Sequence, residues 1–142
     1  MCTSAQEKEI AIVAHRGYWN CDAAGSAKNS LASLKQAQEL GVWGSEFDVN
    51  MSLDGELLVF HDGSVDGKRI EKHPASDFDY YRLKNGEQIP RLDQYLEQAL
   101  KHPETMLVFE LKKHSCDSVE TKAVEASIAK LKEYGLFNPQ NV

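Results

Sequence analysis

The sequence lacks the features that mark two common classes of protein. Basic residues are the minority, 16 against 22 acidic residues, so the formal net charge is −6. A nucleic-acid binder needs a basic surface to displace phosphate counterions, and attraction to an anionic membrane surface needs one too. No apolar run approaches the roughly 18 residues that a membrane span requires. We therefore expect no nucleic-acid partner and no transmembrane segment.

Cysteine is also scarce. Cys2, Cys21 and Cys116 include no CxxC pair and are too few for a disulfide scaffold, although one Cys21–Cys116 bridge stays open. The first residues contain no apolar stretch typical of a signal peptide. We expect residues 1–9 to form a flexible leader of a soluble chain. Cys2 before a polar segment is compatible with a lipid anchor, so a periplasmic or anchored location and a cytoplasmic one both stay open.

The remaining composition, 42% hydrophobic and 27% charged, is typical of a globular protein of 142 residues. We expect one domain or slightly less, over residues 10–142. The apolar run 10–14 is typical of a strand buried on both faces. Residues 106–111 form another apolar strand pattern, with Glu110 and Lys112 pointing the same way. Residues 45–51 alternate strictly, so that every second side chain shares one face. Residues 62–88 carry no such pattern and are expected to form an irregular excursion.

Three segments have the spacing of amphipathic helices. The first begins after Ser30, a plausible N-cap, and ends at Gly41. The apolar side chains expected to face the core in these segments are Leu31, Leu34, Ala37 and Leu40; Leu92, Leu96 and Leu100; and Val124, Ile128 and Leu131. Strands that alternate with helices predict an α/β fold with a mainly parallel sheet and right-handed crossovers.

The Asp54-Gly55 dipeptide is a strong hairpin signal, with residues 56–60 as the returning strand. If these two residues alone form the loop, Asp48 opposes His61 across the hairpin. Opposed residues point to the same face, with Cβ atoms about 4.5–5.5 Å apart. The hairpin would then bring His61 beside the carboxylates of the preceding strand.

Acidic side chains gather where ligands bind in parallel α/β folds, at the carboxyl ends of the strands. Glu46 and Asp48 share one face of their strand, and Glu110 lies on another strand. Three carboxylates at close range repel one another unless a cation or protons lie among them. Oxygen donors without thiolates or a tight histidine pair favour Mg²⁺ or Ca²⁺ over zinc. The alternatives are a solvated strand face and a structural ion-pair network.

Cationic and imidazole side chains follow the same strand ends. Arg16 and Lys112 would bind an anionic substrate, for which phosphate is the natural candidate. His15 and His61 are two groups of the type that exchanges protons near neutral pH, as a general acid and a general base must. Trp19, just after the His-Arg-Gly turn, is expected to line the site. This combination predicts cleavage of a phosphodiester.

The same residues resemble the glycerophosphodiester phosphodiesterases over about residues 10–140. The shared segments, in chain order, are His15-Arg16-Gly17, Asn29-Ser30-Leu31, Glu46-Phe47-Asp48, Asp54-Gly55, Val59-Phe60-His61-Asp62, Ile89-Pro90-Arg91-Leu92-Asp93 and Glu110-Leu111-Lys112. The family usually has an acidic residue where this chain has Lys28, and more often Glu where it has Asp93.

The resemblance implies a TIM barrel that uses a divalent cation, Mg²⁺ or Ca²⁺, to split a glycerophosphodiester into sn-glycerol 3-phosphate and an alcohol. The roles it implies are an acid/base pair, His15 and His61; metal ligands, Glu46, Asp48 and Glu110; phosphate contacts, Arg16 and Lys112; and a substrate-positioning side chain, Asn29. Residues 62–88 would be the family's small insertion after the second strand.

The length of the chain leaves two other hypotheses open. A (β/α)₈ barrel takes about 250 residues, and this chain supplies about three strand–helix units. One alternative is a truncated, inactive partial barrel that binds a metal or phosphate and self-associates through open sheet edges. The other is a phospholipase-like relative in which an internal hydroxyl attacks and a cyclic phosphate forms.

Overall fold

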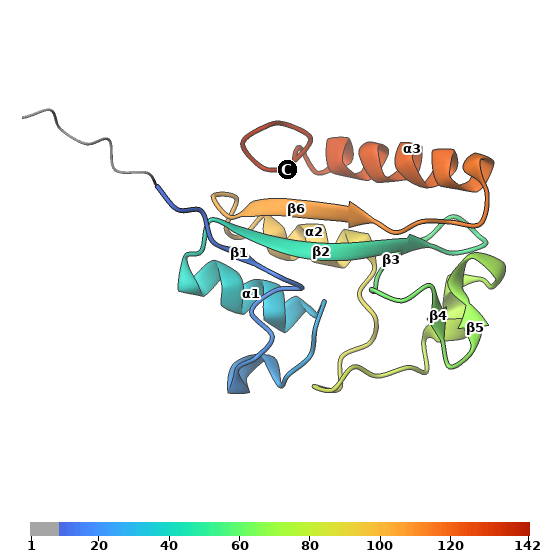
Figure 1. Ribbon diagram of the computed structural model, residues 1–142, viewed down its shortest axis with the longest axis horizontal. Helices are drawn as coiled ribbons and strands as arrows, with labels where there is room; N and C mark the ends of the chain where they lie inside the picture. The colour runs from blue at the N-terminus through green and yellow to red at the C-terminus, as the bar shows by residue number, and fades with distance from the viewer. Residues whose placement is uncertain (1–8) are drawn as a thin grey trace, which may run out of the picture.

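The computed structural model describes residues 9–142 and contains one main sheet (Figure 1). Strand β2 (Gly44–Met51) is central and pairs in parallel with both β1 (Val13–Ala14) and β6 (Met106–Leu111). Strand β3 (Leu57–Val59) returns antiparallel to β2. The parallel strands confirm the α/β class expected from the alternation of strand and helix patterns.

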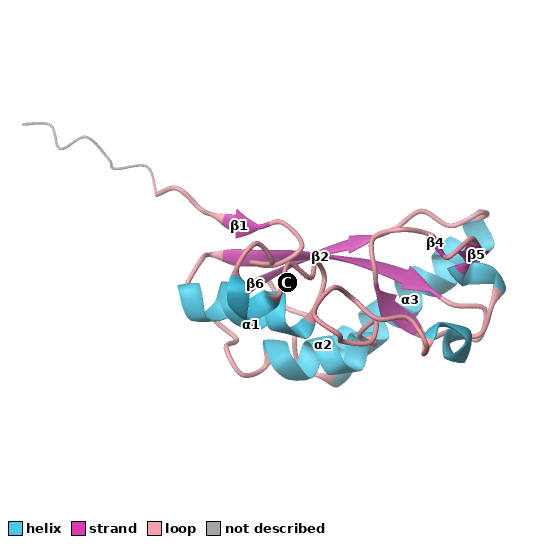
Figure 2. Cartoon of the chain, turned by 90° about the horizontal axis from the view of Figure 1, so that it is seen from below, coloured by secondary structure: helices cyan, strands magenta, loops and turns pink. Residues whose placement is uncertain are grey.

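Three helices cover one face of this sheet, and Figure 2 shows them on the same side of β2. They are α1 (Leu31–Leu40), α2 (Leu92–Ala99) and α3 (Asp117–Glu133). The core between them includes Leu34, Phe47, Val49, Met51, Leu57, Val59, Leu92, Tyr95, Leu96, Ala99, Leu107, Ala123 and Leu131. Because side chains alternate along a strand, Phe47, Val49 and Met51 face the helices and their neighbours face the opposite side.

The predicted start and end of α1 are confirmed. The Ser30 side chain accepts a hydrogen bond from the Ser33 backbone N–H at 2.9 Å, and the Ser33 hydroxyl accepts one from the Ser30 N–H. The helix ends at Gly41, which has a φ of 76° in the left-handed region. These two caps fix where the chain enters β2.

Residues 62–88 form the irregular excursion expected between β3 and α2. It contains a short hairpin, β4 (Ser64–Val65) and β5 (Lys68–Arg69), and two 3₁₀ turns, Ile70–Lys72 and Ala75–Phe78. A third 3₁₀ turn, Asp22–Ala24, precedes α1. Val65, Ile70, Ala75 and Phe78 of the excursion pack with Leu58 of β3 and Ile89 in a second, smaller core, which explains how a segment without periodicity is ordered.

The prediction that residues 10–14 form a strand buried on both faces is wrong. Only Val13 and Ala14 are in β1, and Ile10 and Ile12 are 86% and 61% exposed. Within residues 9–142, β1 pairs with β2 alone, so one of its edges has no neighbouring strand. An apolar run identifies a strand, but its burial depends on a neighbour on each side.

The predicted two-residue hairpin loop is also wrong. Ser52 donates its backbone N–H to the Glu56 carbonyl at 2.8 Å, so the loop consists of Leu53, Asp54 and Gly55. Gly55 has a φ of 83°. This three-residue loop, with a left-handed glycine at its end, is the next most common hairpin connection.

The longer loop shifts the hairpin register by one residue. Met51 pairs with Leu57, and Asp48 lies opposite Phe60, whose N–H donates to the Asp48 carbonyl at 3.0 Å. His61 is therefore not opposite Asp48 as expected. The strand ends at Val59, and His61 comes to the site by a different route, described below.

Three core predictions for the helices are wrong as well. Leu40, Leu100 and Val124 are 60%, 44% and 42% exposed, whereas the predicted neighbours Leu92, Leu96 and Leu131 are buried. Helix α2 ends at Ala99, so Leu100 leaves the helical face that its spacing assumed. In α3 the buried face is formed by Ala123, Ser127 and Leu131 instead.

Other expectations fall partly outside the described residues. Cys21 and Cys116 are both free, so they form no bridge. No helix within residues 9–142 is both long and apolar enough to cross a membrane. The expected leader, apart from an exposed Glu9, and the suggested anchor at Cys2 lie outside the described part of the chain.

Substitution of Leu96 and Leu100 by alanine tests the corrected helix face. Leu96→Ala should lower the free energy of unfolding by about 2–5 kcal/mol, because it leaves a cavity in the core. Leu100→Ala should cost less than about 1 kcal/mol, because its side chain is largely solvated. Urea denaturation measures both, and equal losses would contradict this assignment of the core.

Candidate active site

Three carboxylates meet on the face of the sheet that the helices leave uncovered. Glu46 and Asp48 lie on β2, and the parallel register places Glu110 of β6 directly beside Asp48. One oxygen from each of Glu46, Asp48 and Glu110 lies within 4.8 Å of the others. We call these three residues the carboxylate trio. The structure brings together the three acids that the strand patterns predicted on a common face.

The members of the trio differ in burial and in the pKa that results. Glu46 is buried, and desolvation raises the pKa of its carboxyl above the ordinary value, although a hydrogen bond from the Arg16 N–H at 2.9 Å opposes this. Glu110 is exposed, and the hydrogen bond from Lys112 lowers the pKa of its carboxyl. The same bond, 2.8 Å long, raises the pKa of Lys112.

Asp48 is the most deeply buried of the three, with only 1% of its surface exposed. Arg16 Nε lies 3.6 Å from its Oδ2, and Lys112 Nζ lies 3.5 Å from its Oδ1. Asn29 Nδ2 donates to Oδ2 at 3.0 Å, and Asn29 Oδ1 accepts from the Asp48 N–H at 3.3 Å. A buried carboxylate needs such partners, since unpaired charge in an apolar interior is costly. These three predicted substrate contacts therefore all touch the trio.

Both predicted histidines lie at this end of the sheet. His15 Nε2 is 3.7 Å from Glu46 Oε2, with its side chain 71% exposed. His61 Nδ1 is 2.6 Å from Asp62 Oδ1, and His61 is one of the groups that lower the pKa of the Glu110 carboxyl. Asp62 fixes the orientation of the His61 ring and leaves its Nε2 free for another partner.

His61 owes its place to Asn50, which the sequence analysis did not single out. Asn50 shares the β2 face of the trio, and its Nδ2 donates to the Phe60 carbonyl at 2.8 Å and the Asp62 carbonyl at 3.1 Å. The chain around His61 is thereby tied to the sheet just beyond the end of β3. The strict alternation of residues 45–51 put Asn50 on this face and was the available signal.

A tight turn presents His15 and Arg16. Arg16 adopts a φ of 58°, and Gly17 follows with a φ of 78°. A Cβ atom on Gly17 would lie 2.4 Å from Ser33 Oγ, so only glycine fits against α1 there. Ser33 Oγ donates to the Arg16 carbonyl at 3.1 Å. The left-handed backbone at Arg16 is a strained conformation of the kind that gathers at functional sites.

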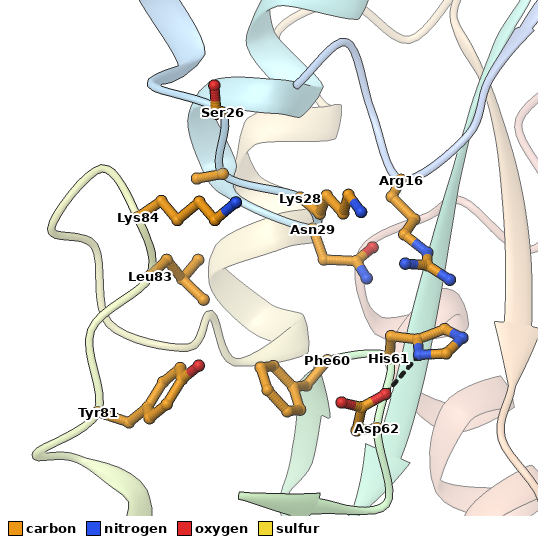
Figure 3. Close-up of a pocket in the computed structure, with 11 residues that line it drawn as sticks. Arg16, Ser26, Lys28, Asn29, Phe60, His61, Asp62, Tyr81, Leu83 and Lys84 are labelled. Carbon is orange, nitrogen blue, oxygen red and sulfur yellow. Dashed lines mark hydrogen bonds and ion pairs between the residues drawn. The ribbon is translucent and has the colours of Figure 1, made fainter. Parts of the chain in front are cut away.

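A pocket of about 210 Å³ adjoins these residues (Figure 3). Its lining includes Arg16, Lys28, Asn29, Phe60, His61, Asp62, Tyr81 and Lys84. The sequence analysis placed neither Tyr81 nor Lys84 at the site, because nothing in the irregular segment 62–88 indicated which residues return to it. Trp19, expected to line the site, instead places its ring 4.6 Å from the Lys28 ammonium.

The trio fits a divalent cation. Its donors are all hard carboxylate oxygens, as Mg²⁺ and Ca²⁺ prefer. Glu46 Oε1 is buried and has no hydrogen-bond partner within residues 9–142. A buried acceptor without a partner is unusual in proteins and needs an explanation such as an ion. A cation among the trio would satisfy this oxygen and offset the repulsion between the carboxylates.

Comparison with known proteins gives the family. The model of the glycerophosphoryl diester phosphodiesterase family matches residues 15–141. The chain belongs to this family. The match contains every segment that suggested the resemblance.

Related sequences carry the same name. The glycerophosphodiester phosphodiesterase of Caldanaerobacter subterraneus is 34% identical over 61% of this chain and 39% of its own length. Human glycerophosphodiester phosphodiesterase 1 is 30% identical over 78% of this chain and 36% of its own.

Solved structures of phosphodiesterases are also similar to this chain. The glycerophosphodiester phosphodiesterase of Parabacteroides distasonis is 41% identical, with a TM-score of 0.83 over 87% of this chain and 51% of that one. A phosphodiesterase of Oleispira antarctica, solved with the product sn-glycerol-3-phosphate, is 29% identical, with a TM-score of 0.71 over 88% of this chain and 53% of its own. The chain thus spans about half or less of the length of these relatives.

Replacement of Glu46 by glutamine tests the trio as a cation site. Because burial raises the Glu46 pKa, ionisation of this group costs stability, and the cost grows as pH rises from the unfolded-state pKa through the folded-state pKa. In EDTA at pH 7 the Glu46→Gln variant should therefore melt at a higher temperature than the parent. The difference should shrink as the pH is lowered toward the unfolded-state pKa.

Added Mg²⁺ or Ca²⁺ should reverse this order. A free-ion concentration about 100-fold above Kd adds about 2.7 kcal/mol of stability to the parent, and Glu46→Gln should lose most of that gain. Glu125→Gln, on the exposed face of α3, should keep it. An equal gain in parent and Glu46→Gln would remove Glu46 from the cation site.

Proposed function

We propose that this chain is the catalytic part of a metal-dependent phosphodiester hydrolase that cleaves glycerophosphodiesters to sn-glycerol 3-phosphate and an alcohol. The observation that carries the proposal is the carboxylate trio with Arg16, Lys112 and both histidines around it. The family membership supports the reaction class. The product bound in the Oleispira antarctica relative supports the choice of glycerol phosphate as the conserved half of the substrate.

In this proposal Glu46, Asp48 and Glu110 hold Mg²⁺ or Ca²⁺. A divalent cation bound there supplies a Lewis acid that polarises a phosphoryl oxygen and stabilises its negative charge. The cationic side chains beside the trio would provide further contacts for the phosphate.

Arg16 and Lys112 are placed to contact that phosphate. Arg16 Nε faces Asp48 Oδ2 at 3.6 Å while its side chain stays 20% exposed, so the rest of the guanidinium can donate to a phosphate oxygen. Lys112 contributes a point charge already held by Asp48 and Glu110. Asn29 keeps Asp48 in place through two hydrogen bonds. Trp19 contributes indirectly, because its ring contacts the Lys28 ammonium.

His15 and His61 serve as the acid/base pair. One imidazole takes the proton of the attacking water, and the other donates a proton to the oxygen of the departing alcohol. Such proton transfers typically contribute 10²- to 10⁴-fold to a rate. Asp62 holds Nδ1 of His61 in its hydrogen bond, so the exchangeable position on that ring is Nε2.

We also propose that residues 10–142 form the first three strand–helix units of a (β/α)₈ barrel, with residues 62–88 as an insertion after the second strand. Two features support this. Ile10 and Ile12 are exposed beside β1, and the outer side of β6 carries an apolar surface that includes Trp43, Met106 and Phe109. Further strands of a barrel would cover both edges, whereas open edges would promote self-association.

Alanine substitution of the histidines tests the function. His15→Ala and His61→Ala should each lower kcat about 10²- to 10⁴-fold in the hydrolysis of glycerophosphocholine with Mg²⁺ or Ca²⁺. His102→Ala, remote from the trio and paired with Glu104, should leave kcat unaltered. Phosphorus NMR identifies the product directly.

Three results would change the assignment. Hydrolysis that persists in both histidine variants would remove the acid/base roles. A cyclic phosphate product would identify attack by an internal hydroxyl in place of water. Cation or phosphate binding without any turnover of the parent would mean that these residues form an inactive binding fragment.

A further inference from the structure

The pocket beside the trio has walls from three separate segments: residues 26–29 before α1, residues 60–62 after β3, and residues 81–84 of the irregular excursion. Arg16 and His61 belong both to this pocket and to the surroundings of the trio. None of the three carboxylates of the trio lines it. The pocket therefore begins where the reacting phosphate would lie and extends away from the acidic groups.

Positive charge dominates these walls. Arg16, Lys28 and Lys84 contribute three cations, and Asp62 contributes the one carboxylate among the lining residues. That carboxylate is engaged by His61 at 2.6 Å. Figure 3 shows Lys84 reaching from its segment toward the side of the pocket that carries Lys28. Neither lysine forms an ion pair within residues 9–142, so both ammonium groups are free to meet a ligand.

The segments that carry the lysines are held in place. The Glu87 carboxylate accepts hydrogen bonds from the Leu31 and Ala32 N–H groups at 2.9 and 3.2 Å, at the start of α1. The Leu83 N–H donates to the Glu87 carbonyl at 2.8 Å, which closes the turn around Lys84. This turn is thus fixed to the helix beside which the other lysine lies.

The opposite wall is fixed as well. The Lys28 ammonium lies over the Trp19 ring, a cation–π contact that restrains the long side chain. Ser26 and Asn29, on either side of Lys28, both have non-glycine left-handed backbones with φ of 58° and 55°. Strained residues of this kind persist where the surrounding structure holds them and gather at ligand-binding sites.

We propose that this pocket binds the alcohol half of the substrate and that Lys28 and Lys84 select alcohols bearing an anionic group, a phosphate or a carboxylate. The inference rests on the proposed function, which places the glycerol phosphate half at the trio. Ammonium groups recognise phosphate and carboxylate through charge-assisted hydrogen bonds. The two lysines would therefore attract an anionic group on the alcohol into this pocket.

The pocket also contains aromatic rings, which in another setting would suit a quaternary ammonium. Phe60 and Tyr81 pack edge to face with their centroids 5.7 Å apart. A choline group would gain from such rings, but here it would lie between unpaired ammonium groups of the same sign. The charges therefore favour an anionic alcohol over a cationic one.

A matched pair of diesters tests the selection. Glycerophosphoinositol 4-phosphate and glycerophosphoinositol differ only in one phosphate on the alcohol. We expect kcat/KM and affinity to favour the phosphorylated diester about tenfold, and the Lys28→Gln/Lys84→Gln double variant to lose this preference. Lys122→Gln, on the exposed face of α3, is the matched control and should retain it. Affinity is measured by calorimetry in EDTA, where no turnover occurs.

The outcomes separate this inference from the proposed function. Turnover of both diesters with no preference, or with a preference that survives in the double variant, would overturn the inference and leave the proposed function intact. A higher kcat/KM for glycerophosphocholine than for the phosphorylated diester would also overturn it. If neither diester is hydrolysed, the proposed function fails, and the ratio of the two dissociation constants in parent and double variant still decides whether the lysines select the anionic group.

Discussion

Repulsion among three carboxylates is the constraint around which this end of the molecule is organised. The fold brings Glu46, Asp48 and Glu110 within 4.8 Å of one another, and the surrounding residues offset the charge to different degrees. Asp48 receives two cations and an amide, and Glu110 receives Lys112. Glu46 has a raised pKa and one buried oxygen that no other group in the described part of the chain contacts by a hydrogen bond. The balance is incomplete at Glu46, which is why a cation fits there.

The sheet determines this geometry. Parallel pairing of β2 with β6 aligns Asp48 with Glu110, and alternation along β2 places Glu46 and Asn50 on the same face. All three helices pack on the other face, where the apolar side chains of β2 point. The uncovered face can therefore hold charged groups without disturbing the core. The loops beyond the strand ends then add the histidines and Arg16, and hydrogen bonds to the sheet and to α1 hold these loops at Arg16 and Phe60.

The sequence predicted those parts of the structure that depend on local periodicity. Strict alternation placed the carboxylates of β2 on one face, and Ser30 and Gly41 marked the ends of α1. Features that depend on a partner distant in the chain were predicted less well. The prediction that residues 10–14 are buried was wrong, because a strand is buried at both edges only where another strand pairs with each edge. The predicted hairpin register was wrong, because the Asp54-Gly55 dipeptide fits both a two-residue and a three-residue loop.

His61 lies near the trio as expected, but not for the reason that the sequence suggested. The expected register placed it opposite Asp48, whereas hydrogen bonds from Asn50 to the residues on either side of His61 hold it near the trio. Lys84 and Tyr81 could not be assigned to the pocket at all, since the Glu87 contact that folds their segment against α1 joins residues more than fifty positions apart.

The central claim, that the trio binds one divalent cation, is tested most directly by anomalous X-ray scattering from crystals of this chain soaked in Mn²⁺ as a substitute for Mg²⁺. The account predicts a single strong peak bonded to oxygens of Glu46, Asp48 and Glu110, with Glu46 Oε1 among them. A peak bound elsewhere with none at the trio, or a trio that separates when the ion is supplied, would contradict it.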